Sequence, residues 1–227
     1  MQNANFKIED WLKSAAVKLN ATFKGRLLFI GLQGSYARNE ATKESDIDLV
    51  VILDELKFDD LKIYRSIIMN MENSYLACGF ISGKYELQKW SKQDLFQFFY
   101  DTKPIQGKLE DIIEPPKKED IKRAAKTGAE NLYHMAVHSF VHSNNYTEDL
   151  KHLYKNTFFI LQTKYFIETE KYIPTKKELL EVLSGADKEI LDICINKDKI
   201  SNTTLIELET LYAKLIQWSR ENITVQV

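Results

Sequence analysis

One short stretch, residues 27–53, constrains the fold more than any other part of the chain. It starts with an apolar run at residues 27–30, which predicts a β-strand, and continues through two glycines and a serine. Such residues let a backbone approach a phosphate group closely. A short helix is expected over residues 36–42. Its first turn, with the Ser35 hydroxyl and unpaired N–H groups, would offer a site for an anion.

A pair of carboxylates opens the next apolar run. Asp48 begins residues 48–53, a β-branched and leucine-rich sequence that predicts a second strand, and Asp46 lies two residues earlier. Because side chains alternate along a strand, both carboxylates lie on the same side of it. Two neighbouring negative charges repel each other, and a divalent cation removes that repulsion. Hard oxygen ligands beside a phosphate site favour Mg²⁺, with Mn²⁺ as the alternative.

These two motifs resemble a known superfamily. Gly34-Ser35-x-Ala37-Arg38 with Ser45-Asp46-Ile47-Asp48-Leu49 is similar to the nucleotidyltransferases that include DNA polymerase beta. The resemblance is closest to small bacterial members, namely aminoglycoside and lincosamide nucleotidyltransferases and minimal nucleotidyltransferases paired with a helical HEPN-type partner. A hairpin with an acidic strand is the alternative interpretation, because Gly-Ser is also common in turns.

The resemblance implies a third acid, since two-metal phosphoryl transfer in this superfamily uses three. Glu86 is the expected one, because it occupies a strand-like sequence at residues 85–90, roughly where the family places its third acid. The family more often has Asp there, and Asp101 and Asp54 are the alternatives. A solvent-facing strand residue is the other interpretation of Glu86. The predicted catalytic and metal-binding residues are therefore Asp46, Asp48 and Glu86.

The resemblance also implies how a nucleoside triphosphate would be held. Gly34 and Ser35 would cradle the terminal phosphates of ATP or another triphosphate. Arg38 follows Ser35 by one helical turn, where its guanidinium could hold the triphosphate. The alternative is a surface arginine paired with a nearby glutamate. In the antibiotic-modifying relatives a lysine of the second domain contacts the triphosphate, and Lys155 is the candidate here.

Hydrophobic periodicity divides the chain into an α+β part and a helical part. The proline pair in Glu114-Pro115-Pro116-Lys117 cannot continue a helix and predicts a domain boundary. We expect a mixed β-sheet with flanking helices, of the polymerase beta-like fold, over residues 1–114 as the catalytic domain. Residues 115–227 would form an antiparallel helical bundle that binds substrate or is HEPN-like. The expected elements are helices at 8–23, 58–76, 92–100, 120–142, 147–169 and 187–195, helices starting near Thr175 and Thr204, and strands at 26–30, 48–53 and 85–90.

Composition limits the partners. The 227 residues are 44% hydrophobic, enough for real cores, and 31 basic against 33 acidic residues give a net charge of −2. Proteins that bind nucleic acid normally carry an excess of basic residues, so this balance argues against a nucleic-acid substrate. No apolar stretch approaches the ~20 residues that span a bilayer, and residues 1–10 lack a signal-peptide layout. We therefore expect a cytoplasmic protein with no membrane partner, and leave a homodimer open.

The implied reaction is Mg²⁺-dependent transfer of a nucleoside monophosphate, with AMP expected, to a hydroxyl group of an aminoglycoside-like small molecule, releasing pyrophosphate. A separate helical domain would form the wall of a cleft for such a polyhydroxylated acceptor. One alternative is nucleotidylation of a partner protein, as antitoxin-like enzymes perform. Another is a nucleotide-binding regulatory module without catalysis. Glu148 or Glu130 of the helical domain would serve as general base.

Overall fold

The computed structural model of the chain describes residues 6–224. The chain divides into two compact units, Met1–Pro115 and Pro116–Val227, so the boundary lies one residue from the expected position. Part of the signal-peptide expectation concerns residues 1–5, which lie outside the described range. Within residues 6–224, no helix combines the length and the apolar character that crossing a membrane requires.

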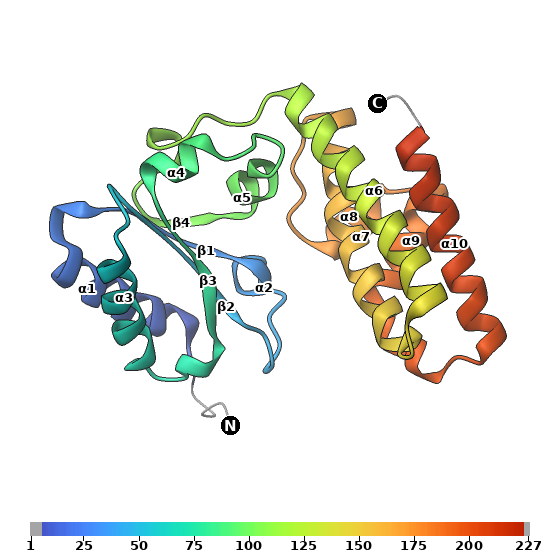
Figure 1. Cartoon of the computed structure of the whole chain (residues 1–227), viewed down its shortest axis with the longest axis horizontal. Coiled ribbons are helices and arrows are strands. Elements are labelled where there is room, and N and C mark those ends of the chain that lie inside the picture. Colours follow the sequence, from blue (N-terminus) through green and yellow to red (C-terminus); the bar gives the residue numbers. More distant parts are fainter. Residues whose placement is uncertain (1–5, 225–227) are drawn as a thin grey trace. The chain divides into compact units, whose positions relative to one another are not determined.

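A four-stranded mixed sheet in the order β3-β2-β1-β4 forms the centre of the first unit (Figure 1). Strand β1 is antiparallel to both β2 and β4, and β3 runs parallel to β2. Gln33, at the end of β1, pairs with Asp48, at the start of β2. Pro104 is tolerated in β4 because an edge strand does not need every N–H group. The strands are β1 (Leu27–Gln33), β2 (Ile47–Leu53), β3 (Ala77–Gly83) and β4 (Lys103–Gln106).

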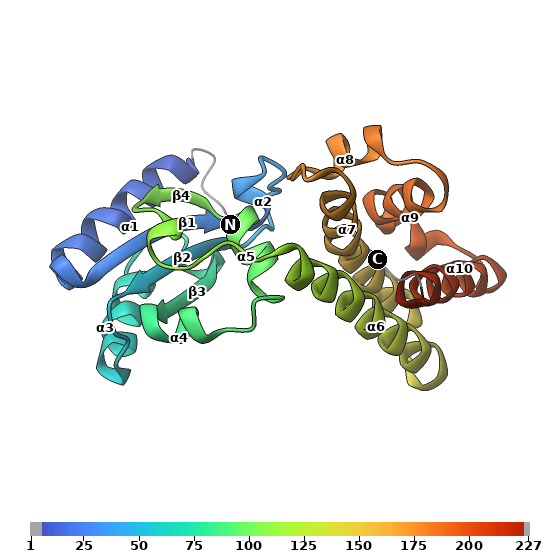
Figure 2. The same cartoon turned by 90° about the horizontal axis from the view of Figure 1, so that it is seen from above.

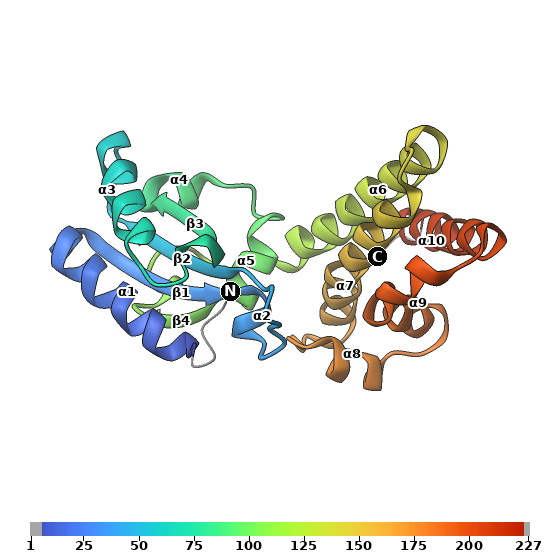
Figure 3. The ribbon, with the colours of Figure 1, turned by 90° about the horizontal axis from the view of Figure 1, so that it is seen from below.

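Helices cover both faces of this sheet. Helices α1 (Ile8–Phe23) and α3 (Phe58–Met69) lie side by side on one face (Figure 3), where Leu49 and Val51 of β2 join their core. Val50 of β2 faces the other way, into a core formed with α4 (Lys84–Lys89) and α5 (Leu95–Asp101). Because successive strand residues point to opposite faces, Asp48 shares the α5 side with Val50.

Residues 85–90 were expected as a strand, and this prediction was wrong. They lie mainly in α4, where Leu87 is buried and most of the other side chains are exposed. Glu, Leu, Gln and Lys all favour helix. With one buried residue in six, the pattern does not distinguish the helical period of 3.6 residues from the strand period of two. The third strand in chain order is β3 instead. Gly79 lies inside it with φ +124, and a Cβ there would lie 2.2 Å from the Leu49 carbonyl oxygen. This glycine therefore allows close strand pairing and does not end the strand.

Other boundaries in the first unit also differ from those expected, among them β1, which extends to Gln33, and α5, which begins at Leu95. Helix α3 ends at Met69, before Asn73, whose φ of 52° is left-handed. No strand was expected at residues 103–106, where β4 lies. Helix α2 spans only Gly34–Ala37, not residues 36–42. Short 3₁₀ helices complete the chain at Lys24–Arg26, Ser74–Leu76, Leu109–Asp111 and Lys197–Asn202.

The second unit is wholly helical within its described residues. Helix α6 packs on α7 and α10, and α9 packs on α7 (Figures 1 and 2). Their core includes Tyr154, Phe158 and Tyr212. Helices begin after Thr175 and Thr204 as expected, and the hydroxyl of each threonine accepts from the N–H of the glutamate three residues later. The α+β class with C-terminal helices is thus confirmed. The helices are α6 (Lys118–His142), α7 (Tyr146–Thr169), α8 (Lys176–Val182), α9 (Gly185–Ile195) and α10 (Leu205–Thr224).

Candidate active site

The glycine-serine segment lies directly after β1. The side-chain amide of Gln33 donates to Thr102 Oγ1 at 2.6 Å and to the Phe98 carbonyl oxygen at 3.3 Å, which fastens the end of β1 to the end of α5. The short helix α2 follows, and the chain then turns through a hydrogen bond of 2.8 Å from the Glu40 N–H to the Ser35 carbonyl oxygen. The glycine-serine segment therefore begins where β1 is hydrogen-bonded to α5, and it ends in a turn closed by its own backbone.

Gly34 and Asp48 are in close contact at this point. Gly34 has φ +70, and a Cβ on it would lie 1.9 Å from Asp48 Oδ2 and 2.9 Å from Asp48 Cγ. Asp48 is half-buried and lies opposite Gln33 in the β1–β2 ladder. Only glycine both adopts this backbone conformation without strain and leaves room for the carboxylate. The requirement for Gly34 thus arises from the neighbouring aspartate as well as from a turn.

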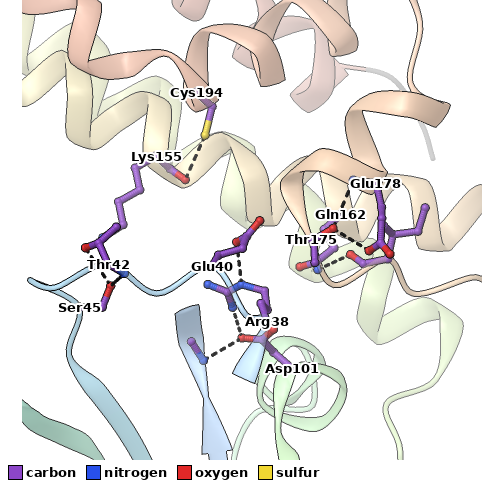
Figure 4. A network of polar contacts seen from close by, with 12 residues as sticks. Arg38, Glu40, Thr42, Ser45, Asp101, Lys155, Gln162, Thr175, Glu178 and Cys194 are labelled. Carbon is purple, nitrogen blue, oxygen red and sulfur yellow. Dashed lines mark hydrogen bonds and ion pairs between the residues drawn. The ribbon is translucent and has the colours of Figure 1, made fainter. Parts of the chain in front are cut away.

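Asp46 enters the same region from the loop before β2. Its side chain is exposed, and it stands two residues before Asp48, one residue outside β2. The loop before it is closed by Thr42 and Ser45, because Ser45 Oγ accepts from the Thr42 N–H at 2.9 Å (Figure 4). The structure therefore brings the predicted Asp46, Asp48, Gly34 and Ser35 to one end of the sheet.

A third carboxylate at this end belongs to Asp101, the last residue of α5. Two residues later Lys103 pairs with Leu32, so α5 delivers Asp101 beside the end of β1. Asp101 Oδ2 accepts from the Gly34 N–H at 3.4 Å and from Arg38 Nη1 at 2.5 Å (Figure 4). The side chains of the Arg38–Asp101 ion pair are 8% and 10% exposed. Asp101 had been an alternative third acid, and its position here fits that role.

Arg38 also carries a second acidic contact. Its Nε donates to Glu40 Oε2 at 3.4 Å. The guanidinium thus lies between the carboxylates of Asp101 and Glu40, directly after the glycine-serine segment. Pairing with a nearby glutamate was the alternative to a phosphate role, and in this structure that pairing exists alongside a stronger one to Asp101.

Glu86, the predicted third acid, lies at the opposite end of the sheet. It follows Gly83 by three residues, and Gly83 pairs with Leu53, whereas Asp48 pairs with Cys78. Five strand residues separate these pairs, a distance of about 17 Å at ~3.3 Å per residue. The Glu86 carboxylate lies against Gly83, where an added Cβ would be 2.3 Å from Glu86 Oε2. The structure therefore does not bring Glu86 to the Asp46 and Asp48 pair, and a catalytic or metal-binding role for Glu86 stays a prediction that this position does not support.

The physical reason is the direction of β3. Because β3 is parallel to β2, residues that follow it emerge at the far end, away from the carboxylates that open β2. Asp54, the other alternative, also lies at that far end, where it accepts from Arg26 Nε at 3.1 Å. Among the acids considered from the sequence, Asp101 alone joins the Asp46 and Asp48 pair.

Lys155 and the candidate bases belong to the second unit. Lys155 is an exposed residue of α7, and its carbonyl oxygen accepts from Cys194 Sγ at 4.0 Å. Its contact with a triphosphate stays a prediction. Of the candidate bases, Glu148 is ion-paired with Lys151 at 2.7 Å and Glu130 with Lys126 at 3.9 Å.

The second unit also holds a cavity of about 410 Å³ that the sequence did not predict. His138 and His142 of α6 line it together with Asp149 and His152 of α7. Hydrogen bonds from Ser143 and Ser139 lower the pKa of Asp149, so its carboxylate is ionised at neutral pH. Spacing along α6 alone does not predict that a carboxylate from the next helix lines the same cavity as these imidazoles.

The carboxylates of the first unit are chemically suited to Mg²⁺. Asp46 and Asp48 offer hard oxygen atoms at the start of β2, and Asp101 adds a third carboxyl group at the same end of the sheet. Mg²⁺ commonly takes only one or two protein carboxylates and fills its remaining positions with water and substrate phosphates. Within residues 6–224, no three His, Cys, Asp or Glu side chains already surround one point. The donor set therefore fits a cation that arrives with phosphates.

Comparisons with known proteins agree with this chemistry. The model of the Nucleotidyltransferase domain family matches residues 17–132, which include every site residue of the first unit named above. The "Putative protein adenylyltransferase MJ0128" of Methanocaldococcus jannaschii is 34% identical over 93 residues, which are 39% of this chain and 92% of that protein.

Two solved structures are also similar. Spectinomycin adenyltransferase AAD(9) from Enterococcus faecialis, with ATP and spectinomycin, aligns over 96% of this chain and 99% of its own, with a TM-score of 0.59 and 16% identity, and so shares the fold. A toxin-antitoxin structure with AMP-PNP aligns over 57% of this chain and 94% of its own at 21% identity, with a TM-score of 0.32, too low for a fold argument. From the family match and the carboxylate-lined loop, the chain belongs to the nucleotidyltransferase family and is a nucleotidyltransferase.

Proposed function

We propose that this enzyme transfers a nucleoside monophosphate, AMP in the first instance, from a nucleoside triphosphate to a hydroxyl group of a small polyhydroxylated molecule. One observation carries the proposal. Asp46, Asp48 and Asp101 lie at the same end of the sheet, beside Gly34 and Arg38. Carboxylates for a cation and a glycine-serine segment for phosphates are the two parts that phosphoryl transfer needs.

The reaction balances without any further reagent. The acceptor oxygen forms a bond to the α-phosphorus, and the bond from that phosphorus to the α,β-bridging oxygen breaks. Pyrophosphate leaves with the bonding electrons, and the acceptor proton passes to a carboxylate or to water. Asp46, Asp48 and Asp101 would hold Mg²⁺ or Mn²⁺, which when bound neutralises phosphate charge and lowers the pKa of the acceptor hydroxyl.

The residues of this chain would prepare the triphosphate for that step. Gly34 leaves the space that Asp48 occupies, and it lets backbone N–H groups approach the terminal phosphates. Arg38 would hold phosphate oxygens through two parallel N–H donors. Lys155, on the second unit, is our candidate for a further contact to the triphosphate.

The acceptor is proposed from the similarity of this chain to known proteins. A small-molecule acceptor is favoured because the neighbour of shared fold over nearly the whole chain, both units included, is described as a spectinomycin adenyltransferase. The second candidate is a protein hydroxyl group, because the relative with 34% identity is named a protein adenylyltransferase. That relative matches only 39% of this chain, so it bears less on the second unit.

A labelling experiment tests the proposal. The protein is incubated with Mg²⁺ and α-³²P-labelled ATP, GTP, CTP or UTP, together with a panel of aminoglycosides and lincosamides or with cell lysate. We expect label on a small molecule, absent with Asp48→Asn. Label on a protein band instead would favour the second acceptor. If Mg²⁺-dependent nucleotide binding is present and no acceptor is labelled with any nucleotide, a regulatory module becomes the better account.

A further inference from the structure

The Arg38–Asp101 ion pair joins two residues to which the proposed function gives separate tasks. Arg38 would hold phosphates and Asp101 would help to hold the divalent cation. In this structure they neutralise each other, with Arg38 Nη1 2.5 Å from Asp101 Oδ2 and both side chains nine-tenths buried. Neither residue can perform its task fully while this contact persists.

The contact is built into the site. The Asp101 oxygen that meets Arg38 also accepts from the Gly34 N–H at 3.4 Å, and Gly34 in turn packs against Asp48. Thr102, the residue after Asp101, accepts from Gln33, which is paired with Asp48 in the sheet. The ion pair is thus fastened on both sides to the end of β1, beside the carboxylates that open β2.

Opening the pair for one ligand alone is unfavourable. A cation that takes Asp101 leaves the Arg38 guanidinium with less compensation in a buried place, and a phosphate that takes Arg38 does the same to Asp101. When both ligands arrive, each of the two charges gains a new partner. The free-energy cost of breaking the ion pair is then offset by the two binding events together, so each ligand favours binding of the other.

We propose that the Arg38–Asp101 ion pair is a lock that makes the divalent cation and the nucleotide bind cooperatively, with Arg38 standing in for the cation at Asp101 until both ligands are present. This inference rests on the proposed function, because it needs a nucleotide and a cation to bind at this site. It assigns Arg38 a positioning role toward Asp101 in the absence of ligand, in addition to its contact with phosphate.

Two equilibrium measurements test the lock by freeing one partner at a time. In Asp101→Asn the guanidinium loses its main partner, so we expect the metal-free affinity for a non-hydrolysable ATP analogue, measured by calorimetry with EDTA, to rise about tenfold. Asp46→Asn is the matched control, because it removes one carboxylate from the same end of the sheet and leaves the ion pair intact. A general charge effect would tighten nucleotide binding equally in both variants, and that result would overturn the lock.

The reciprocal measurement uses Mn²⁺ without nucleotide, followed by electron paramagnetic resonance. Arg38→Gln frees Asp101, and we expect Mn²⁺ to bind roughly fivefold more tightly than to the wild type. Arg26→Gln is the control, since it removes an arginine paired with Asp54 and Asp60 at the far end of the sheet. Unchanged Mn²⁺ affinity in Arg38→Gln also overturns the lock. If the wild type shows no Mn²⁺-dependent nucleotide binding, the proposed function itself is refuted. Failure of the lock and failure of the proposed function therefore give different results.

Discussion

Replacing Gly34 with alanine should separate catalysis from folding, because the structure shows two distinct costs. The first is backbone strain, since alanine at φ +70 costs about 1–2 kcal/mol. The second is a collision, because the new Cβ would lie 1.9 Å from Asp48 Oδ2. Ordinary contact begins near 3.4 Å, so the carboxylate must move by about 1.5 Å. A displacement of this size at a reacting centre costs about a hundredfold in rate.

The assay is nucleotide-dependent release of pyrophosphate, measured with the acceptor that the labelling experiment identifies. We expect Gly34→Ala to lose about a hundredfold in kcat. Gly185→Ala is the matched control, because Gly185 also has a positive φ, +55, and a Cβ there would meet nothing within 4 Å. Both variants should lower the melting temperature by a few degrees, and only the first should lose activity. If Gly34→Ala stays within threefold of Gly185→Ala, the position of Asp48 does not matter to the chemistry and the proposed site is incorrect.

Three further predictions concern the carboxylates of the first unit. Asp48→Asn should abolish turnover and leave the melting temperature unchanged or higher, because a negative charge is removed from beside Asp46, and calorimetry should show weaker Mg·ATP binding. Asp101→Asn should reduce the rate of pyrophosphate release about a hundredfold, whereas Glu86→Gln should stay within twofold of the wild type. A larger loss in Glu86→Gln than in Asp101→Asn would identify Glu86 as the third acid. The hydrogen bond and charge of Arg26 lower the pKa of Asp60 to about 2, so the stability from this pair is present above pH 4 and lost as pH falls toward 2. Urea unfolding should therefore show Arg26→Gln costing less stability at pH 2.5 than at pH 6, and an equal cost at both pH values would contradict the assignment.

The sequence predicted those parts of the fold that depend on local rules. Helix α1 spans the expected residues 8–23 because its apolar side chains repeat at helical spacing. Thr175 and Thr204 precede helices because the hydroxyl of each accepts from the backbone N–H three residues later. The Asp46 and Asp48 pair and the Gly34 turn were found for the same reason, since the motif that contains them is contiguous in the chain.

The parts that failed depend on contacts between distant segments. No strand was expected at residues 77–83, yet β3 lies there, because Gly79 permits a close approach to Leu49 that only the neighbouring strand reveals. Residues 85–90 have a composition that fits either a strand or a helix, and the burial of Leu87 beneath the sheet decides for the helix. Local propensity cannot settle such cases, because the packing that decides them is tertiary.

The third carboxylate shows how sheet topology, and not chain order, selects the members of a site. In an antiparallel pair the start of one strand lies beside the end of the other. Both β2 and β4 are antiparallel to β1, so the residues that precede each of them flank the end of β1. Asp46 and Asp48 open β2, Asp101 precedes β4, and Gly34 follows β1 between them. The order β3-β2-β1-β4 therefore places an acid before β4 at the phosphate loop and sends any acid after β3 to the far end.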